Sequence, residues 1–364
     1  MSQEKIEIVD LPQEVLHQIL SYKKNGSDEK LLSTIAATHS IFGHNPFQFD
    51  RIMTKLKQSI VEGKMERVAT LRQVRPDLVP EIKSLLTPIV FTLAGFAEQD
   101  KMEAILKACP ELLFTYARLK DISGVCPVIN DPEIEESARG ITLFQHAVWA
   151  GDMRHMCTMI LKCLPKNEEG ERIRIELLRQ YKELISKGVA YEVNGVKREE
   201  KQFSLQELID ALRDYDKKYA KMSPTERQLH WCTVVGIAQN RLPAIIRHHY
   251  CDPKEAFWKT PTFTKAKLTR SLQVYNHLES KMQSWDEVLP GLGSAFGITW
   301  AIRRSGDGGR GGAAGRACAL PDDLQSIEYL CKVRTKIDRP ALLKLLKTPI
   351  QRPDDNPKSC CVIS

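Results

Sequence analysis

Signals that start and stop helices recur through the second half of the chain, and they constrain its fold more than any other feature. An amphipathic stretch over 173–187 runs into Gly188, and glycine ends helices because it adopts a left-handed conformation without strain. Ser204 and Glu207 have the spacing of a capping box, in which each side chain binds the other residue's backbone N–H. These signals predict helices over 173–187 and 205–222.

The same region carries one further helix start and one strand signal. Ser223, Pro224 and Glu226 cap a helix predicted over 225–240. Alternating residues flank Asn194-Gly195, a pair typical of a two-residue hairpin turn. We therefore expect residues 166–347 to form a larger, mostly helical domain with a short β-hairpin.

Residues 49–165 show weak internal similarity. The segment GKMERVATLRQVRPDLV from Gly63 recurs as QDKMEAILKACPELLF from Gln99, and a third copy starts at Thr142. The pattern predicts two or three degenerate helix-pair repeats, which bind proteins on a concave face; a plain helical bundle is the alternative. The third copy is similar to an ankyrin repeat at Thr142, Leu143, Ala147, Gly151, Met153 and Ile160.

Composition excludes several classes of protein. The chain has 364 residues, which predicts two or three domains, and no apolar run long enough to span a membrane. Its N-terminus lacks the basic and apolar regions of a secretory signal. The ten cysteines are scattered without a C-x-x-C pair, which favours buried free thiols in a reducing cytosol over a zinc site.

Candidate chemistry in the middle of the chain is weak. Two histidine–cysteine groups could supply a nucleophile pair or metal ligands: His230 with Cys232, and His248 with Cys251. We favour packing roles for these side chains and expect no metal site. The glycine-rich segment 291–297 matches a phosphate-binding loop only in its glycine count, which is a weak signal. Residues 305–317 predict a flexible surface loop, with a ligand-binding lid as the alternative. No interleaved aromatic residues or known module indicate nucleic-acid binding.

Near the start of the chain stands DLPQEVLHQIL, then a polar break, then a second apolar stretch. Pro12 suits the first turn of a helix that Asp10 caps. The stretch resembles an F-box, and the resemblance implies a small helical hook that docks on the ubiquitin-ligase adaptor Skp1; an ordinary amphipathic helix pair is the alternative. The docking residues that it implies are Leu11, Pro12, Glu14, Leu16, Ile19, Leu20, Leu31 and Leu32.

The sequence ends in Cys361-Val362-Ile363-Ser364. This order fits the C-a-a-X signal for prenylation, and serine in the last place favours a farnesyl group on Cys361. One lipid chain binds a membrane only marginally, so a second signal is expected. Two are present: Cys360, a candidate for palmitoylation, and a segment over 331–358 with eight basic and three acidic residues.

A wider family resemblance covers residues 140–347. The segments LFQHAVWAGDMRHMCTMILKCLP, HWCTVVGIAQNRLPAIIRHHYCDPKEAFWKTPTF, PGLGSAFGITWAIRRSGD and LCKVRTKIDRPALLKLL are similar to a module of Legionella translocated effectors. With the two terminal motifs, the chain resembles the Legionella ankyrin B-like family of F-box effectors. The resemblance implies a protein translocated into a host cell and held peripherally on the cytosolic face of a host membrane. The resemblance implies no catalytic residues for this chain.

The sequence thus predicts a mainly α protein in four parts: an F-box-like hook (1–48), ankyrin-like repeats (49–165), an effector-type domain (166–347) and a flexible lipidated tail (348–364). We expect an adaptor that joins an unknown protein substrate to the host Skp1–cullin ligase, with a host prenyltransferase and a membrane surface as further partners. Beyond the lipids, no cofactor is expected. The alternative is an enzyme within 140–347, such as an ADP-ribosyltransferase-like transferase, that modifies a host protein and has the F-box and lipid tail as targeting elements.

Overall fold

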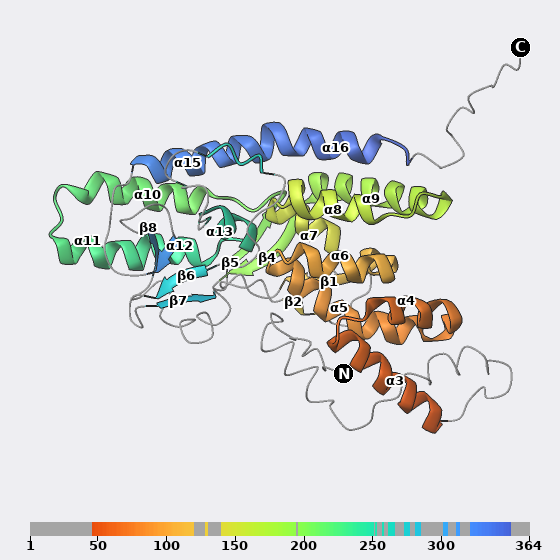
Figure 1. Ribbon diagram of the computed structural model, residues 1–364. Helices are drawn as coiled ribbons and strands as arrows, with labels where there is room; N and C mark the ends of the chain where they lie inside the picture. Colours follow the sequence, from red (N-terminus) through yellow and green to blue (C-terminus); the bar gives the residue numbers. More distant parts are fainter. Residues whose placement is uncertain are drawn as a thin grey trace, which may run out of the picture.

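The fold is mainly α, as predicted. The computed structural model describes residues 46–119, 128–129, 140–193, 196–250, 252, 257, 261–265, 273–276, 281–284, 301–304, 311–313 and 321–350. Figure 1 shows an elongated helical body in which a long C-terminal helical run follows one edge. Its early helices are α3 (Pro46–Val61), α4 (Met65–Val74), α5 (Val79–Gly95), α6 (Gln99–Ala108), α7 (Leu143–Ala150), α8 (Thr158–Cys163) and α9 (Glu168–Lys187).

The early helices form pairs with a repeated turn geometry. The pairs are α3 with α4, α5 with α6, and α7 with the π-helical η3 (Met153–Cys157). In all three, the residue just before the second helix has nearly the same backbone conformation. The φ and ψ angles are −79° and 64° at Lys64, −78° and 71° at Glu98, and −86° and 49° at Asp152. The similarity seen in the sequence therefore corresponds to a repeated local structure, while the ankyrin-like assignment stays a prediction. Each second helix carries a buried methionine in its first turn: Met65, Met102 and Met153.

Helix α5 lies in the core of this region. The stretch Pro76–Gly95 is long and apolar enough to cross a membrane by composition, but half of it is buried inside the protein. It includes the 3-10 turn η1 (Pro76–Leu78), and α5 packs against α4, α6 and α7. Helix α5 is thus the central helix of the paired region, and burial of its apolar side chains stabilises the fold.

A buried polar network joins α7 to α9. Thr142 caps α7 in a capping box with Gln145. The Thr142 hydroxyl also donates to Gln180 Oε1 of α9 over 2.7 Å, and Gln145 Nε2 donates to the Gln180 carbonyl over 3.2 Å. All three side chains are buried, so the network satisfies groups that would otherwise lack partners.

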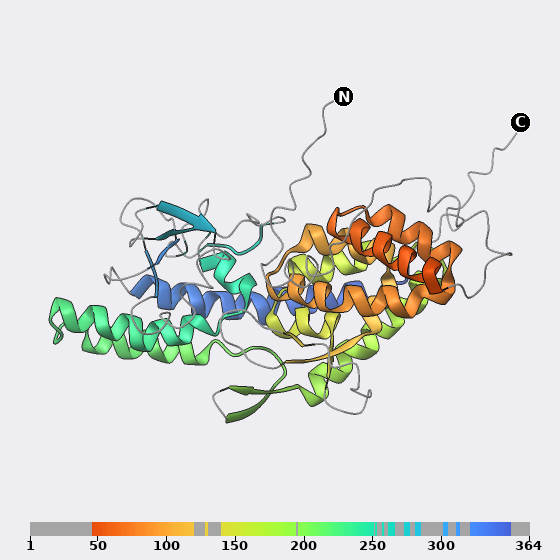
Figure 2. The ribbon, with the colours of Figure 1, turned by 90° about the horizontal axis from the view of Figure 1, so that it is seen from below.

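The hairpin is confirmed. Gly188, with a φ of 79°, ends α9 and leads into β4 (Val189–Val193), which pairs antiparallel with β5 (Val196–Glu200). The predicted turn residues 194–195 lie outside the described residues. Figure 2 shows the hairpin extending away from the helical body.

The first predicted capping box is wrong. Helix α10 (Gln206–Tyr219) starts after Leu205, and no side chain caps it in the predicted way. Glu207 instead binds two arginines of neighbouring elements, Arg198 and, over 2.6 Å, Arg241. An ion pair with two guanidinium groups outcompetes a bond to one backbone N–H.

The second capping box is confirmed. Ser223 and Glu226 each bind the other residue's backbone N–H at the start of α11 (Pro224–His230). Helix α11 continues through the π-helical segment η4 (Trp231–Val235) into α12 (Gly236–Asn240), and α13 (Ala244–Tyr250) follows.

Small sheets complete the fold. One has the order β2-β1-β3, from β1 (Tyr116–Leu119), β2 (Val128–Ile129) and β3 (Ile141–Thr142). The other has the order β7-β6-β9-β8, from β6 (Gln273–Asn276), β7 (Lys281–Ser284), β8 (Ile302–Arg304) and β9 (Gly311–Ala313).

The expected surface loop over 305–317 is wrong in part. Its residues Gly311–Ala313 form β9, a strand that pairs on both sides. Strand pairing gives its backbone groups partners that an exposed loop would find only in water.

A buried glutamine fixes this second sheet to the helices. Gln239 of α12 accepts from the Ile302 N–H over 2.8 Å and donates to the Ile302 carbonyl over 3.0 Å. The side-chain amide therefore replaces a neighbouring strand at β8. Trp231 donates to the same carbonyl over 3.1 Å.

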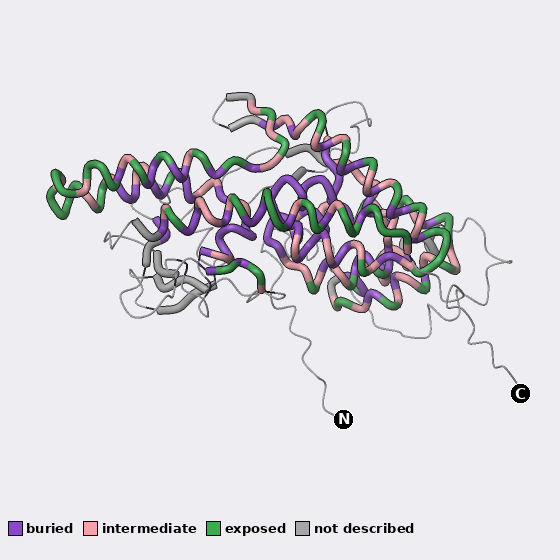
Figure 3. The backbone as a smooth tube through the Cα atoms, turned by 90° about the horizontal axis from the view of Figure 1, so that it is seen from above, coloured by how far each residue is buried: buried purple, intermediate pink, exposed green. Residues whose placement is uncertain are grey.

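The last helical run spans both halves of the protein. It comprises α15 (Pro321–Lys332), the π-helical η6 (Val333–Asp338) and α16 (Arg339–Lys347). Helix α15 packs on α10, and α16 packs on α9 and η3. Figure 3 shows the buried residues gathered along the inner sides of the helices, with exposed residues on the outer turns.

Candidate functional site

A cluster of buried and half-buried charged groups lies where η3 meets η6. Both segments are π-helical, and such segments are frequent at functional sites. Arg154 of η3 forms an ion pair of 2.5 Å with Asp338 of η6, although 184 residues separate them. Burial raises the pKa of the Asp338 carboxyl, while Arg154 opposes that rise.

A buried guanidinium closes the carboxyl end of α7. Arg334 is 3% exposed and donates to the Ala150 carbonyl over 3.1 Å. Burial lowers the pKa of Arg334 to about 10. A cation at this position also opposes the partial negative charge of the helix end. Arg334 therefore joins the last helical run to the paired helices.

Asp152 and His155 stand at the start of η3. Asp152 Oδ1 accepts from the Met156 N–H over 3.0 Å and lies 3.6 Å from His155 Nδ1. His155 Nε2 lies 2.9 Å from the Lys265 carbonyl oxygen. A carbonyl only accepts, so Nε2 carries the hydrogen. The imidazole is held between two acceptors, and its Nε2 is not free to act as a base.

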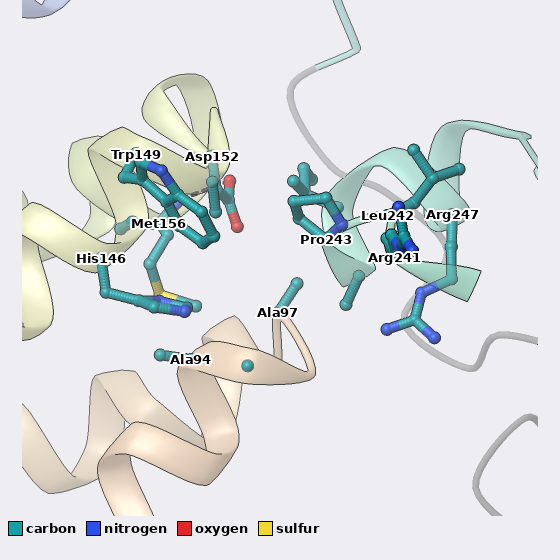
Figure 4. Close-up of a pocket in the computed structure, with 15 residues that line it drawn as sticks. Ala94, Ala97, His146, Trp149, Asp152, Met156, Arg241, Leu242, Pro243 and Arg247 are labelled. Atoms are coloured by element: carbon teal, nitrogen blue, oxygen red, sulfur yellow. Dashed lines mark hydrogen bonds between the residues drawn. The ribbon is translucent and has the colours of Figure 1, made fainter. Parts of the chain in front are cut away.

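A small cavity adjoins this cluster, between the end of α5, α7 and the segment before α13. His146, Trp149, Ala97 and Pro243 line it, with Arg247 on its far side (Figure 4). The cavity measures about 20 Å³, which is room for one or two water molecules. Among the described residues, neither ring nitrogen of His146 has a hydrogen-bond partner. Burial lowers the pKa of His146 to about 4.

A larger groove lies at the carboxyl end of α9. It measures about 420 Å³ and is lined by β1, β4 and α9. Arg179, Glu183, Lys187 and Glu199 give it charges of both signs, and Arg179 is bonded to Glu176 on its own helix. Exposed ion pairs of this kind contribute little to stability.

The described cysteines are poor nucleophiles. Burial raises the pKa of Cys109 to about 12 and that of Cys163 to about 11, and it raises the pKa of Cys157 well above its usual value. The thiolate is the reactive form, so these thiols stay protonated near neutral pH. Cys109, Cys157 and Cys232 are buried free thiols, as predicted.

The two histidine groups noted in the sequence do not meet to form a site. His230 Nε2 lies 3.1 Å from Asp214 on α10. His248 Nε2 lies 3.4 Å from the Phe96 carbonyl. Within the described part of the chain, no three His, Cys, Asp or Glu side chains are placed to hold a metal ion.

The site residues predicted from the sequence lie outside the described residues. These are the Skp1-docking residues Leu11, Pro12, Glu14, Leu16, Ile19, Leu20, Leu31 and Leu32, and the lipidation residues Cys360 and Cys361. The glycine-rich segment 291–297 lies outside them as well. All of these assignments stay predictions.

Sequence reasoning missed the residues of the buried cluster. The one local signal was the spacing of Asp152 and His155, three residues apart, and of Arg334 and Asp338, four residues apart. Such spacing puts two side chains on one helix face. It does not reveal that η3 and η6 face each other.

Comparisons with known proteins give one family and one relative. The family described as the CBUA0006 C-terminal domain matches residues 207–342. The chain is 27% identical over 335 residues to the uncharacterized protein CBUA0006 of Coxiella burnetii, which covers 86% of this chain and 90% of that protein. No solved structure matches the chain. The matched family segment contains Arg334 and Asp338, whereas their partners in α7 and η3 precede it.

Proposed function

We propose that the chain is a bacterial effector that acts as an adaptor of a host Skp1–cullin ubiquitin ligase. The N-terminal stretch from Leu11 to Leu32 docks Skp1, the helical body recruits a protein substrate, and farnesylated Cys361 holds the assembly on the cytosolic face of a host membrane. The observation that carries the proposal is the presence of both eukaryote-directed motifs in one sequence. The similarity to a Coxiella burnetii protein supports a bacterial origin.

The described helical body suits this role. An adaptor has to hold its substrate at a fixed place relative to the ligase. The Arg154–Asp338 ion pair and the bond from Arg334 to Ala150 join the paired helices to the last helical run. These contacts favour a body that moves as one piece.

The described residues give less support to the alternative function, a transferase, than to the adaptor. A transferase needs a pocket that encloses its substrate, with polar groups that converge on it. The cavity at His146 has room for one or two waters, and His155 is held by Asp152 and the Lys265 carbonyl. In the larger groove at the end of α9, Arg179 and Lys187 are paired with glutamates of their own helix. The adaptor is therefore the function that we carry forward.

Capture of purified Skp1 by the immobilised full chain tests the ligase part. We expect the wild type to bind, and Leu11→Ala with Pro12→Ala to lose at least about tenfold in affinity, because these residues would form the centre of the apolar docking surface. Leu229→Ala, which truncates a 60% exposed leucine on the helical body, is the matched control and should bind like the wild type. Absence of binding by the wild type would refute the adaptor function.

Farnesyl transfer tests the membrane anchor. With purified farnesyltransferase and farnesyl diphosphate, the intact mass of the wild type should rise by one farnesyl group. Cys360→Ser should behave likewise, and Cys361→Ser should remain unmodified, since only Cys361 is fourth from the last residue of the sequence. Modification of Cys361→Ser would show that the motif is not the acceptor.

A further inference from the structure

The outer side of η6 and α16 carries exposed positive charges without exposed negative ones. Asp338 is the only acidic residue in 329–350, and it is buried beside Arg154. Arg334, which the sequence count included among the basic residues, is buried too. The exposed charges there are those of Lys332 at the end of α15 and of Lys336, Lys344 and Lys347. Arg339 is half-buried and donates to Gln202, and Glu328, one turn before Lys332, is paired with Arg213.

The same side exposes large apolar residues. Ile337 and Leu345 are each 45% exposed, and Ala341 between them is also exposed. These three residues are spaced by four and so form one row along the helix. We call the surface formed by Lys332, Lys336, Ile337, Ala341, Lys344, Leu345 and Lys347 the basic-apolar face.

We propose that the basic-apolar face lies on an anionic membrane surface. A helix in the plane of a membrane buries apolar side chains at the boundary between headgroups and acyl chains, and its lysines bind anionic headgroups. Lysine stems are long enough to keep the ammonium groups in the headgroup layer while their methylenes contact apolar lipid. The four lysines and the row at Ile337, Ala341 and Leu345 match both requirements.

The placement of the run in the fold fits such a contact. It follows one edge of the molecule (Figure 1), and its inner side packs on α9, α10 and η3. Cys361 comes 11 residues after Ile350, a span of at most about 38 Å. A lipid on Cys361 and the basic-apolar face can therefore engage the same membrane. The inference deepens the membrane part of the proposed function and relies on it only for naming a membrane as the partner.

Vesicle sedimentation tests this face without the lipid anchor. The full chain, purified without a prenyltransferase, is mixed with vesicles of phosphatidylcholine or of phosphatidylcholine with phosphatidylserine. We expect binding to the anionic vesicles only, weakening as salt screens the charges. Replacing Lys332, Lys336, Lys344 and Lys347 by glutamine should weaken it at least tenfold, since each well-placed charge contributes about fivefold.

Two further variants separate the face from total charge. Lys107, Lys201, Lys217 and Lys221 are exposed elsewhere, and replacing these four by glutamine should change binding less than twofold. Ile337→Asn with Leu345→Asn should weaken binding but leave its salt dependence unchanged. Circular dichroism melting checks that each variant is folded.

Three outcomes would overturn the inference: no binding of the wild type to anionic vesicles, equal binding to both kinds of vesicle, or equal loss in the two lysine variants. If the wild type does not bind anionic vesicles, an acidic protein becomes the expected partner of these lysines. None of them bears on Skp1 capture or farnesyl transfer, so failure of this inference and failure of the proposed function remain distinguishable.

Discussion

The guanidinium of Arg334 occupies the space where a side chain on Gly151 would lie. Gly151 ends α7 with a φ of 85°, and a Cβ built there would overlap Arg334 Nε and Nη2. From this position Arg334 reaches the Ala150 carbonyl. The glycine is thus required both by its backbone conformation and by a residue 183 positions later in the chain (334 − 151).

Gly151→Ala should therefore destabilise the protein by about 3 kcal/mol, from left-handed strain together with displacement of a buried guanidinium. Gly63→Ala is the matched control, because Gly63 has a φ of 68° and nothing within 4 Å of the added carbon. It should cost only the strain, about 1 kcal/mol. Urea unfolding of both variants measures the difference, and equal losses would show that Arg334 adds nothing.

His146 makes stability depend on pH. Its pKa is lowered to about 4 by burial, against about 6.5 in the unfolded chain. Below the unfolded value the unfolded state takes up a proton that the folded state excludes, so stability falls as the pH drops from 6.5 towards 4. By linkage, this histidine alone removes about 2 kcal/mol at about pH 5.

His146→Leu should therefore lose about 2 kcal/mol less than the wild type when the pH is lowered from about 7 to about 5. His230→Gln serves as the control, because the His230 side chain is 15% exposed and lies beside Asp214; it should keep most of the wild-type slope. Urea unfolding at the two pH values gives the comparison. Identical slopes for His146→Leu and the wild type would contradict the assignment.

The capping boxes at Ser223 and Thr142 differ in burial, and they should therefore differ in how much they stabilise the protein. Ser223→Ala removes a cap at the surface and should cost about 1 kcal/mol. Thr142→Val removes a cap and also the bond to Gln180, in a place where water does not replace them; it should cost about 2–3 kcal/mol. Thermal or urea unfolding of the two variants orders them, and a smaller loss for Thr142→Val would be evidence against the buried network.

Local signals predicted local structure well. Gly188, the hairpin that follows it and the Ser223 capping box each depend on residues within a few positions of one another, and the structure has all three. The Ser204 prediction was wrong because Glu207 has two arginines within reach, and one of them, Arg241, lies 34 residues further along the chain. A pattern of four residues contains no information about such a competitor.

The buried cluster could not be predicted for the same reason. Arg154 and Asp338 each look like ordinary exposed charges on a helix. They become a half-buried pair because η6 and α16 pack on η3, which is a property of the whole fold. The count of basic residues near the chain end likewise included Arg334, whose buried guanidinium binds the Ala150 carbonyl instead of reaching solvent.

The Arg154–Asp338 ion pair joins the paired helices to the last helical run, and a double mutant tests how much it stabilises the protein. Arg154→Met leaves the Asp338 carboxylate, whose side chain is 8% exposed, without the cation that opposes its desolvation. Leaving this carboxylate without its partner should cost up to about 3 kcal/mol near neutral pH. Adding Asp338→Asn removes the stranded charge, so the double variant should be more stable than Arg154→Met alone.

The pH dependence of Arg154→Met provides the second half of the test. Burial already raises the pKa of Asp338 in the wild type, and loss of Arg154 should raise it further. A carboxyl whose pKa is higher in the folded than in the unfolded state binds its proton more tightly in the folded state. Its ionised form therefore destabilises the protein most above the folded pKa, and this loss of stability shrinks as the pH falls through that pKa. Urea unfolding of Arg154→Met should thus show a smaller deficit at about pH 5 than at about pH 7, and the double variant should show no such change. A deficit independent of pH would mean that Asp338 does not remain buried once its partner is gone.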